Sequence, residues 1–147
     1  MKLTNEFSLA AACCRWPPSD ERDRAVEAAA SHAIDWQRFL RIVRRQRVEG
    51  LVSDALTRAH INAAPEVAAE LRRQAQEIAL KNLGFAAEAL RLNRILEEAG
   101  ITALFVKGVT LDSLAYGSLG LKRARDIDLI IAPDVDEAAC AGLADAG

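Results

Sequence analysis

The sequence has few cysteines, no long apolar run and no surplus of charge of one sign. Its three cysteines, Cys13, Cys14 and Cys140, form no CxxC pair and have no nearby histidine, so neither a disulfide framework nor a zinc site is indicated. No apolar stretch approaches the roughly 18–20 residues that span a bilayer. With 19 Lys and Arg against 21 Asp and Glu, the net charge of −2 gives no general attraction to nucleic acid or lipid. We therefore expect a cytoplasmic protein without a membrane partner.

Proline and glycine are also scarce, at 4 and 8 residues in a chain of 147, which argues against a linker or collagen-like sequence. Apolar residues make up 51% of the chain, enough for one ordinary core, or for a helical module with part of a second domain. From the N-terminus to about residue 98 the pattern is helical. Trp16-Pro17-Pro18 ends a first short helix, and Ser19 and Asp20 are candidate caps for the next.

Two amphipathic patterns stand out in this helical region. Apolar residues at positions i, i+3, i+4 and i+7 from Trp36 to Val43 predict a helix that packs one face on a core. A longer helix is predicted over 65–98, where seam residues alternate steps of four and three: Leu71, Ala75, Ile78, Asn82, Phe85, Ala89, Leu92 and Leu96. Asn82 is the one polar member. It either sets the register of the seam or serves a function toward a neighbouring domain, and we prefer the structural role.

Five arginines between Arg38 and Arg47, without an acid among them, are the strongest local basic feature. They either bind phosphates or form the solvated face of the helix. Because no aromatic residues are interleaved for base stacking and the chain is acidic overall, we favour the solvated face and do not expect a nucleic-acid partner.

The character of the chain changes at Gly100. A short apolar run predicts a strand near 102–107, followed by a helix near 109–117, a strand near 126–132 and a last helix that begins at Pro133-Asp134. The expected fold class is therefore α+β and mostly α. We expect residues 1–98 to form a helical region and residues 99–147 to follow the order strand, helix, strand, helix.

Two carboxylates in the second expected strand are the best candidates for chemistry. In a strand, side chains two residues apart share a face, so Asp126 and Asp128 are expected to project together and offer oxygen ligands to Mg²⁺ or Mn²⁺. The alternative is a structural role, in which one carboxylate caps a turn and the other is solvated. Lys107 and Gly108 at the preceding strand-to-helix junction favour the site, since glycine lets a phosphate approach the backbone and the helix start attracts anions.

The ordered set Phe105-Val106-Lys107-Gly108, Leu111, Tyr116, Arg123 and Asp126 to Ile131 resembles the uncharacterised nucleotidyltransferase family of the DNA polymerase beta-like superfamily. The resemblance covers about residues 99–147 and implies that they form the beginning of a small mixed-sheet core. It implies that Gly108 is the turn glycine that grips a nucleoside triphosphate and that Asp126 and Asp128 are catalytic carboxylates that hold Mg²⁺. Val109 stands where the superfamily has Gly or Ser, so Thr110 is expected to supply the hydroxyl.

The resemblance implies transfer of a nucleoside monophosphate from the triphosphate to an acceptor that the sequence does not identify. Lys107 or Arg123 would neutralise the phosphates. The superfamily's third carboxylate lies on a later strand, so we expect the chain as given to be incomplete, inactive and prone to self-association. The alternative is a non-catalytic helical protein-interaction module with a vestigial Asp pair.

Overall fold

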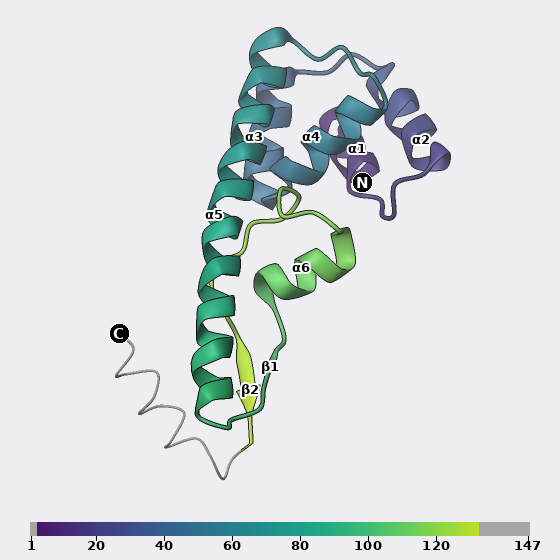
Figure 1. Ribbon diagram of the computed structural model, residues 1–147. Helices are drawn as coiled ribbons and strands as arrows, with labels where there is room; N and C mark the ends of the chain where they lie inside the picture. Colours follow the sequence, from purple (N-terminus) through teal and green to yellow (C-terminus); the bar gives the residue numbers. More distant parts are fainter. Residues whose placement is uncertain (1–2, 133–147) are drawn as a thin grey trace. The chain divides into compact units, whose positions relative to one another are not determined.

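The computed structural model describes residues 3–132, and the apolar periodicity of the sequence is reflected in its elements. Most of the described chain is helical. In chain order the elements are α1 (Asn5–Cys13), α2 (Asp20–Ala30), α3 (Trp36–Gln46), α4 (Glu49–Arg58), α5 (Pro65–Glu98), β1 (Ala103–Phe105), α6 (Gly108–Tyr116) and β2 (Leu129–Ile131) (Figure 1).

Polar caps fix where the first three helices begin. The side chains of Thr4, Ser19 and Asp35 each accept a hydrogen bond from the backbone N–H three residues later, which satisfies a donor that the helix itself leaves unpaired. The expected cap at Ser19 is therefore confirmed.

The described residues divide into two compact units, and the division falls within α5. One unit contains the residues up to Ala79 together with Gly120–Lys122. The other contains Leu80–Leu119 and the described residues from Arg123 onward. In the first unit Gly50 of α4 permits a close backbone contact, because a Cβ at this position would lie 2.1 Å from the carbonyl oxygen of Gly120.

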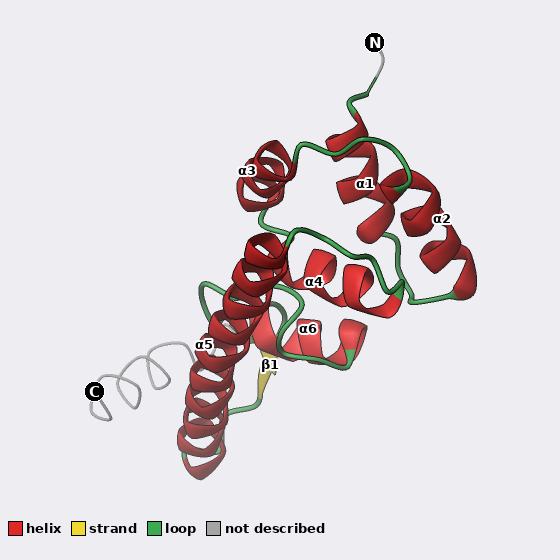
Figure 2. Ribbon diagram, turned by 90° about the horizontal axis from the view of Figure 1, so that it is seen from above, coloured by secondary structure: helices red, strands yellow, loops and turns green. Residues whose placement is uncertain are grey.

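The core of the first unit is built from one face of each of its helices. α1 packs against α2, α3 and α4, and the first turns of α5 add Val67 and Leu71 to the same cluster (Figure 1, Figure 2). The stripe predicted on α3 is confirmed, since Phe39 and Val43 are fully buried and Trp36 contacts Phe39 edge to face at 5.5 Å between ring centroids.

An arginine lies inside this first core. Arg22 of α2 is 1% exposed, and its Nη2 lies 3.1 Å from Oδ2 of Asp54 on α4. Its Nε lies 3.5 Å from Oδ1 of Asp23. Burying a guanidinium costs free energy unless carboxylates compensate its charge, so the pair with Asp54 ties α2 to α4.

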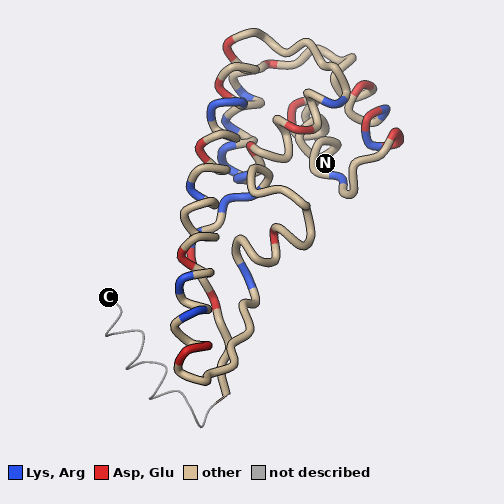
Figure 3. Tube along the Cα trace, viewed as in Figure 1, with Lys and Arg blue, Asp and Glu red and all other residues tan. Residues whose placement is uncertain are grey.

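The long helix α5 has the bounds that its seam predicts, and it continues through Gly84 without a break. All eight seam residues are buried or half-buried, whereas charged residues of both signs alternate along the rest of the helix (Figure 3). No helix in the described part of the chain combines the length and apolar character needed to cross a membrane.

The second unit contains a two-stranded antiparallel sheet. β1 pairs with β2 in the register Ala103 to Ile131, Leu104 to Ile130 and Phe105 to Leu129. One face of the pair packs on Leu96 and Ile101, which form the small core of this unit. The opposite face presents Leu104 and Ile130, which are 63% and 58% exposed. Self-association through such an uncovered face stays a prediction.

The strands are shorter than the sequence predicts. The strand expected over 102–107 is observed at 103–105, and the strand expected over 126–132 is observed at 129–131, so Asp126 and Asp128 precede β2 rather than lie within it. The helix expected near 109–117 is confirmed at 108–116. The last expected helix begins at residue 133 and lies outside the described residues, so the full strand, helix, strand, helix core stays a prediction.

Candidate functional site

The pairing of β1 with β2 brings Lys107 next to Asp128. One residue beyond the last strand pair, the N–H of Val106 donates to the carbonyl oxygen of Asp128 at 3.1 Å. The next residue, Lys107, is the N-cap of α6, and its Nζ lies 3.5 Å from Oδ1 of Asp128. Both side chains reach solvent, at 67% and 33% exposure, so the ion pair is accessible to a ligand.

Gly108 allows the chain before β2 to pass over the start of α6. Its φ of +62° lies in the left-handed region, where side chains with a Cβ are strained. A Cβ at Gly108 would also lie 2.8 Å from the carbonyl oxygen of Asp126. Both the dihedral angle and the contact therefore require glycine, and the contact places the backbone of Asp126 at the first turn of α6.

The first turn of α6 has backbone N–H groups that no side-chain cap satisfies. Its N-cap, Lys107, provides no side-chain hydrogen bond to these groups. The first N–H groups of a helix have no partner within the helix and carry its positive dipole end. This turn and the Lys107 ammonium thus offer two kinds of positive charge to an anion.

The two aspartates differ in environment. Oδ2 of Asp128 is buried without a hydrogen-bond partner, whereas the Asp126 side chain is exposed. An unpartnered carboxylate oxygen such as Oδ2 of Asp128 suits a hard cation such as Mg²⁺, which prefers oxygen ligands and keeps several waters. Among residues 3–132 no group of three or more His, Cys, Asp and Glu is placed to hold a metal ion. The chemistry of the Asp128 carboxylate fits a divalent cation, and a shared site with Asp126 stays a prediction.

Two further residues singled out by the sequence lie apart from this ion pair. Thr110, half-buried in the first turn of α6, lines an apolar cavity together with Phe105, Val109 and Leu114. Arg123 is half-buried in the segment before Asp126. Within the described chain neither residue forms a hydrogen bond or ion pair with Asp126 or Asp128. Their expected phosphate contacts stay predictions.

The contribution of Asn82 is what the sequence reasoning missed. Asn82 is completely buried, and both halves of its amide bind backbone groups of the segment that leads to Asp126. The signal was present as one polar residue in an apolar seam, but the pattern does not reveal which segment lies opposite.

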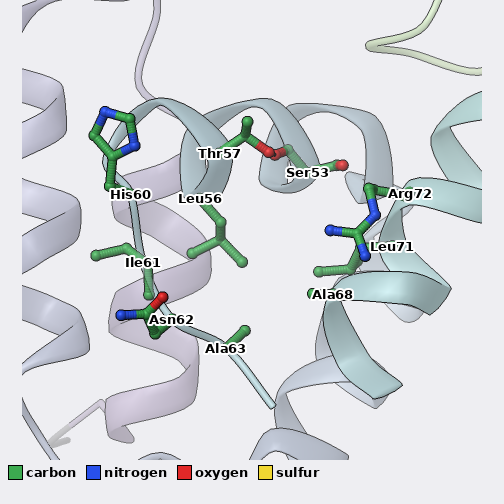
Figure 4. Close-up of a pocket in the computed structure, with 10 residues that line it drawn as sticks. All are labelled: Ser53, Leu56, Thr57, His60, Ile61, Asn62, Ala63, Ala68, Leu71 and Arg72. Carbon is green, nitrogen blue, oxygen red and sulfur yellow. The ribbon is translucent and has the colours of Figure 1, made fainter. Parts of the chain in front are cut away.

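A separate pocket lies in the first unit, between the end of α4 and the start of α5 (Figure 4). It is lined by apolar residues such as Leu56 and Leu71 and by polar side chains such as Thr57, His60 and Arg72. The volume of about 240 Å³ is below the roughly 300–1,000 Å³ typical of small-molecule sites, and no predicted site residue lines the pocket.

The arginines of α3 are exposed, as a solvated face requires. Two of them pair with acids of other helices in the first unit: Arg44 with Glu70 at 2.5 Å and Arg38 with Glu6 at 3.8 Å. These contacts favour the solvated-face interpretation over phosphate binding.

Comparison with known proteins identifies the family. A family model described as an uncharacterised nucleotidyltransferase matches residues 32–147, so the match includes α3, α4 and α5 as well as the C-terminal residues that carry the motif. No curated protein and no solved structure matches the chain. A purely non-catalytic interaction module is not favoured. Because the family model covers most of its length, the chain belongs to the uncharacterised nucleotidyltransferase family.

Proposed function

We propose that this nucleotidyltransferase-like protein binds a nucleoside triphosphate with Mg²⁺ or Mn²⁺ and transfers the nucleoside monophosphate to an acceptor hydroxyl. The observation that carries the proposal is the state of the Asp128 carboxylate. Its Oδ2 is buried without a hydrogen-bond partner, and its Oδ1 lies 3.5 Å from Nζ of Lys107. Beside them, Gly108 lets the Asp126 carbonyl approach the first turn of α6. Cation ligand, phosphate partner and backbone donors thus occur together.

In this proposal Asp126 and Asp128 hold the metal ion. The bound ion supplies positive charge that stabilises the phosphates and the departing pyrophosphate. Lys107 exchanges its partner, from the Asp128 carboxylate to a phosphate oxygen, because a phosphate carries more negative charge than a single carboxylate. The first-turn N–H groups of α6 bind further phosphate oxygens, and the missing Cβ of Gly108 lets the Asp126 backbone lie against this turn.

The reaction itself is a displacement at the α-phosphorus. The acceptor oxygen forms a bond to this phosphorus while the bond to the bridging oxygen of pyrophosphate breaks, and the hydroxyl proton leaves to a base. Lys107 and the helix start compensate charge that is already on the triphosphate and increases on the leaving group. The role of the chain's own residues is therefore to orient the phosphates and to neutralise them.

The test is a double variant, Asp126→Asn with Asp128→Asn, in equilibrium dialysis with radiolabelled ATP in the presence and absence of Mg²⁺. We expect Mg²⁺-dependent binding to be lost while the melting temperature changes little. The reason is that a partly exposed pair such as Lys107–Asp128 contributes only about 0–1 kcal/mol to stability.

The matched control is Glu97→Gln with Glu98→Gln, which removes the same charge from two exposed carboxylates at the end of α5 in the same unit. This control should bind like the wild type. Equal binding by the Asp double variant would overturn the proposal, as would a wild-type chain whose nucleotide binding does not depend on Mg²⁺.

A further inference from the structure

Asn82 occupies an unusual place for a polar residue. It lies in the apolar seam of α5, and its side chain is 0% exposed. Its Nδ2 donates a hydrogen bond to the carbonyl oxygen of Leu119 at 2.6 Å, and its Oδ1 accepts one from the N–H of Ala124 at 3.0 Å. One side chain thus holds two backbone points that are five residues apart.

These two backbone groups need such a partner. Leu119 and Ala124 lie between α6 and β2, where the described chain forms no regular element that would pair them. Ala124 is buried, so solvent cannot readily replace the bond to its N–H. An amide is suited to this position because it offers one donor and one acceptor at once, whereas any apolar seam residue offers neither.

The held segment leads directly to the carboxylates. Asp126 follows Ala124 by two residues, and its carbonyl oxygen is the atom that a Cβ at Gly108 would approach to 2.8 Å. Asp128 follows by four residues and pairs with Lys107. Two residues of extended chain span at most about 7 Å, so a shift of the Ala124 backbone also moves the backbone of Asp126.

We propose that Asn82 is a positioning residue that fixes Asp126 and Asp128 relative to the first turn of α6. It touches neither the metal ion nor the nucleotide and acts through the backbone of Ala124. The inference rests on the function proposed above. Arg123, which directly precedes Ala124, is positioned by the same bond.

The experiment measures two quantities on the 147-residue chain: hydrogen exchange of the Ala124 amide and the dissociation constant for ATP with Mg²⁺. Asn82→Leu removes both hydrogen bonds with a side chain that suits the seam. We expect exchange at Ala124 to become at least tenfold faster and nucleotide binding to weaken at least tenfold, at a temperature where the variant is fully folded.

A second variant separates positioning from simple support of the fold. Asn82→Gln keeps the amide but moves it by one methylene, so Ala124 should stay protected while binding still weakens several-fold. A residue needed only for folding would give wild-type binding in this variant. The matched control is Asn93→Leu, also on α5, whose Nδ2 bonds to Glu97 of its own helix. It should bind within twofold of the wild type.

The outcomes distinguish the two proposals. If Asn82→Leu or Asn82→Gln is folded and binds ATP with Mg²⁺ within twofold of the wild type, the positioning role is overturned and the proposed function stands. If the wild type itself shows no Mg²⁺-dependent binding, the proposed function is overturned, and the positioning role with it. If Asn82→Leu does not fold, the Gln variant decides. A wild-type Ala124 amide that exchanges as fast as a free peptide would also overturn the inference.

Discussion

The contact between Gly108 and Asp126 predicts a measurable cost for a single methyl group. Gly108→Ala places a Cβ at φ +62°, which costs about 1–2 kcal/mol for a residue in the left-handed region. The same Cβ would lie 2.8 Å from the carbonyl oxygen of Asp126, and relieving such an overlap costs about 1–3 kcal/mol more. In Gly108→Ala we therefore expect the free energy needed to open the second unit to fall by about 2–5 kcal/mol.

Gly117 offers a matched control at the other end of the same helix. It also has a φ of +62°, but no atom lies within 4 Å of its Cβ position. Gly117→Ala should therefore cost only the conformational part, about 1–2 kcal/mol. The difference between the two variants isolates the contact with Asp126.

The assay is native-state hydrogen exchange of the Val106 amide, which donates to the carbonyl oxygen of Asp128 and reports the opening of this part of the unit. Exchange rates in the two alanine variants give the two free energies. If both variants lose the same free energy within about 0.5 kcal/mol, the Asp126 backbone does not pack on Gly108 in solution. The close approach that the proposed site requires would then be refuted.

Three further outcomes are expected. Gly84→Ala should raise the urea midpoint, with about 0.5–1 kcal/mol of added stability, because this exposed helical position has no atom within 4 Å of a Cβ. Asp54→Asn should lower the unfolding free energy by about 2–3 kcal/mol in thermal melts, because the buried Arg22 loses a charged partner but keeps a second acid nearby. Hydrogen bonds from the backbone N–H groups of Glu6 itself and of Asp35 lower the pKa of Glu6, so its contribution to stability is present above its ordinary pKa and is lost as pH falls through the lowered one. Glu6→Gln should therefore be less stable than the wild type at pH 7, with the difference closing toward pH 3 in acid titrations.

The helices could be predicted from the sequence because their signals are local. The long helix needs only the steps of four and three between its seam residues, and its bounds at 65 and 98 agree with the prediction. The Ser19 cap likewise depends on a residue three positions away. Neither inference requires knowledge of what lies opposite in space.

The ends of the strands depend on a partner and were therefore predicted too long. The run from Asp126 to Ala132 has the composition of a strand, but β1 provides partners only as far as Phe105 before the chain turns into α6 at Lys107. Asp126 is thus left without a strand opposite it. The same limitation hid the contact of Asn82 with Ala124, 42 residues away in the sequence.

The buried thiol of Cys13 can be used to measure transient opening of the first unit. Cys13 is 0% exposed, and burial raises the pKa of its thiol to about 12, so the folded unit presents almost no thiolate to an alkylating reagent. Reaction must then await an opening of α1 from its neighbours. In a chain with Cys14 and Cys140 replaced by serine, the labelling rate at Cys13 would count these openings. Any ligand that closes the first unit could be detected by the slowing of that rate, without knowing its chemistry in advance.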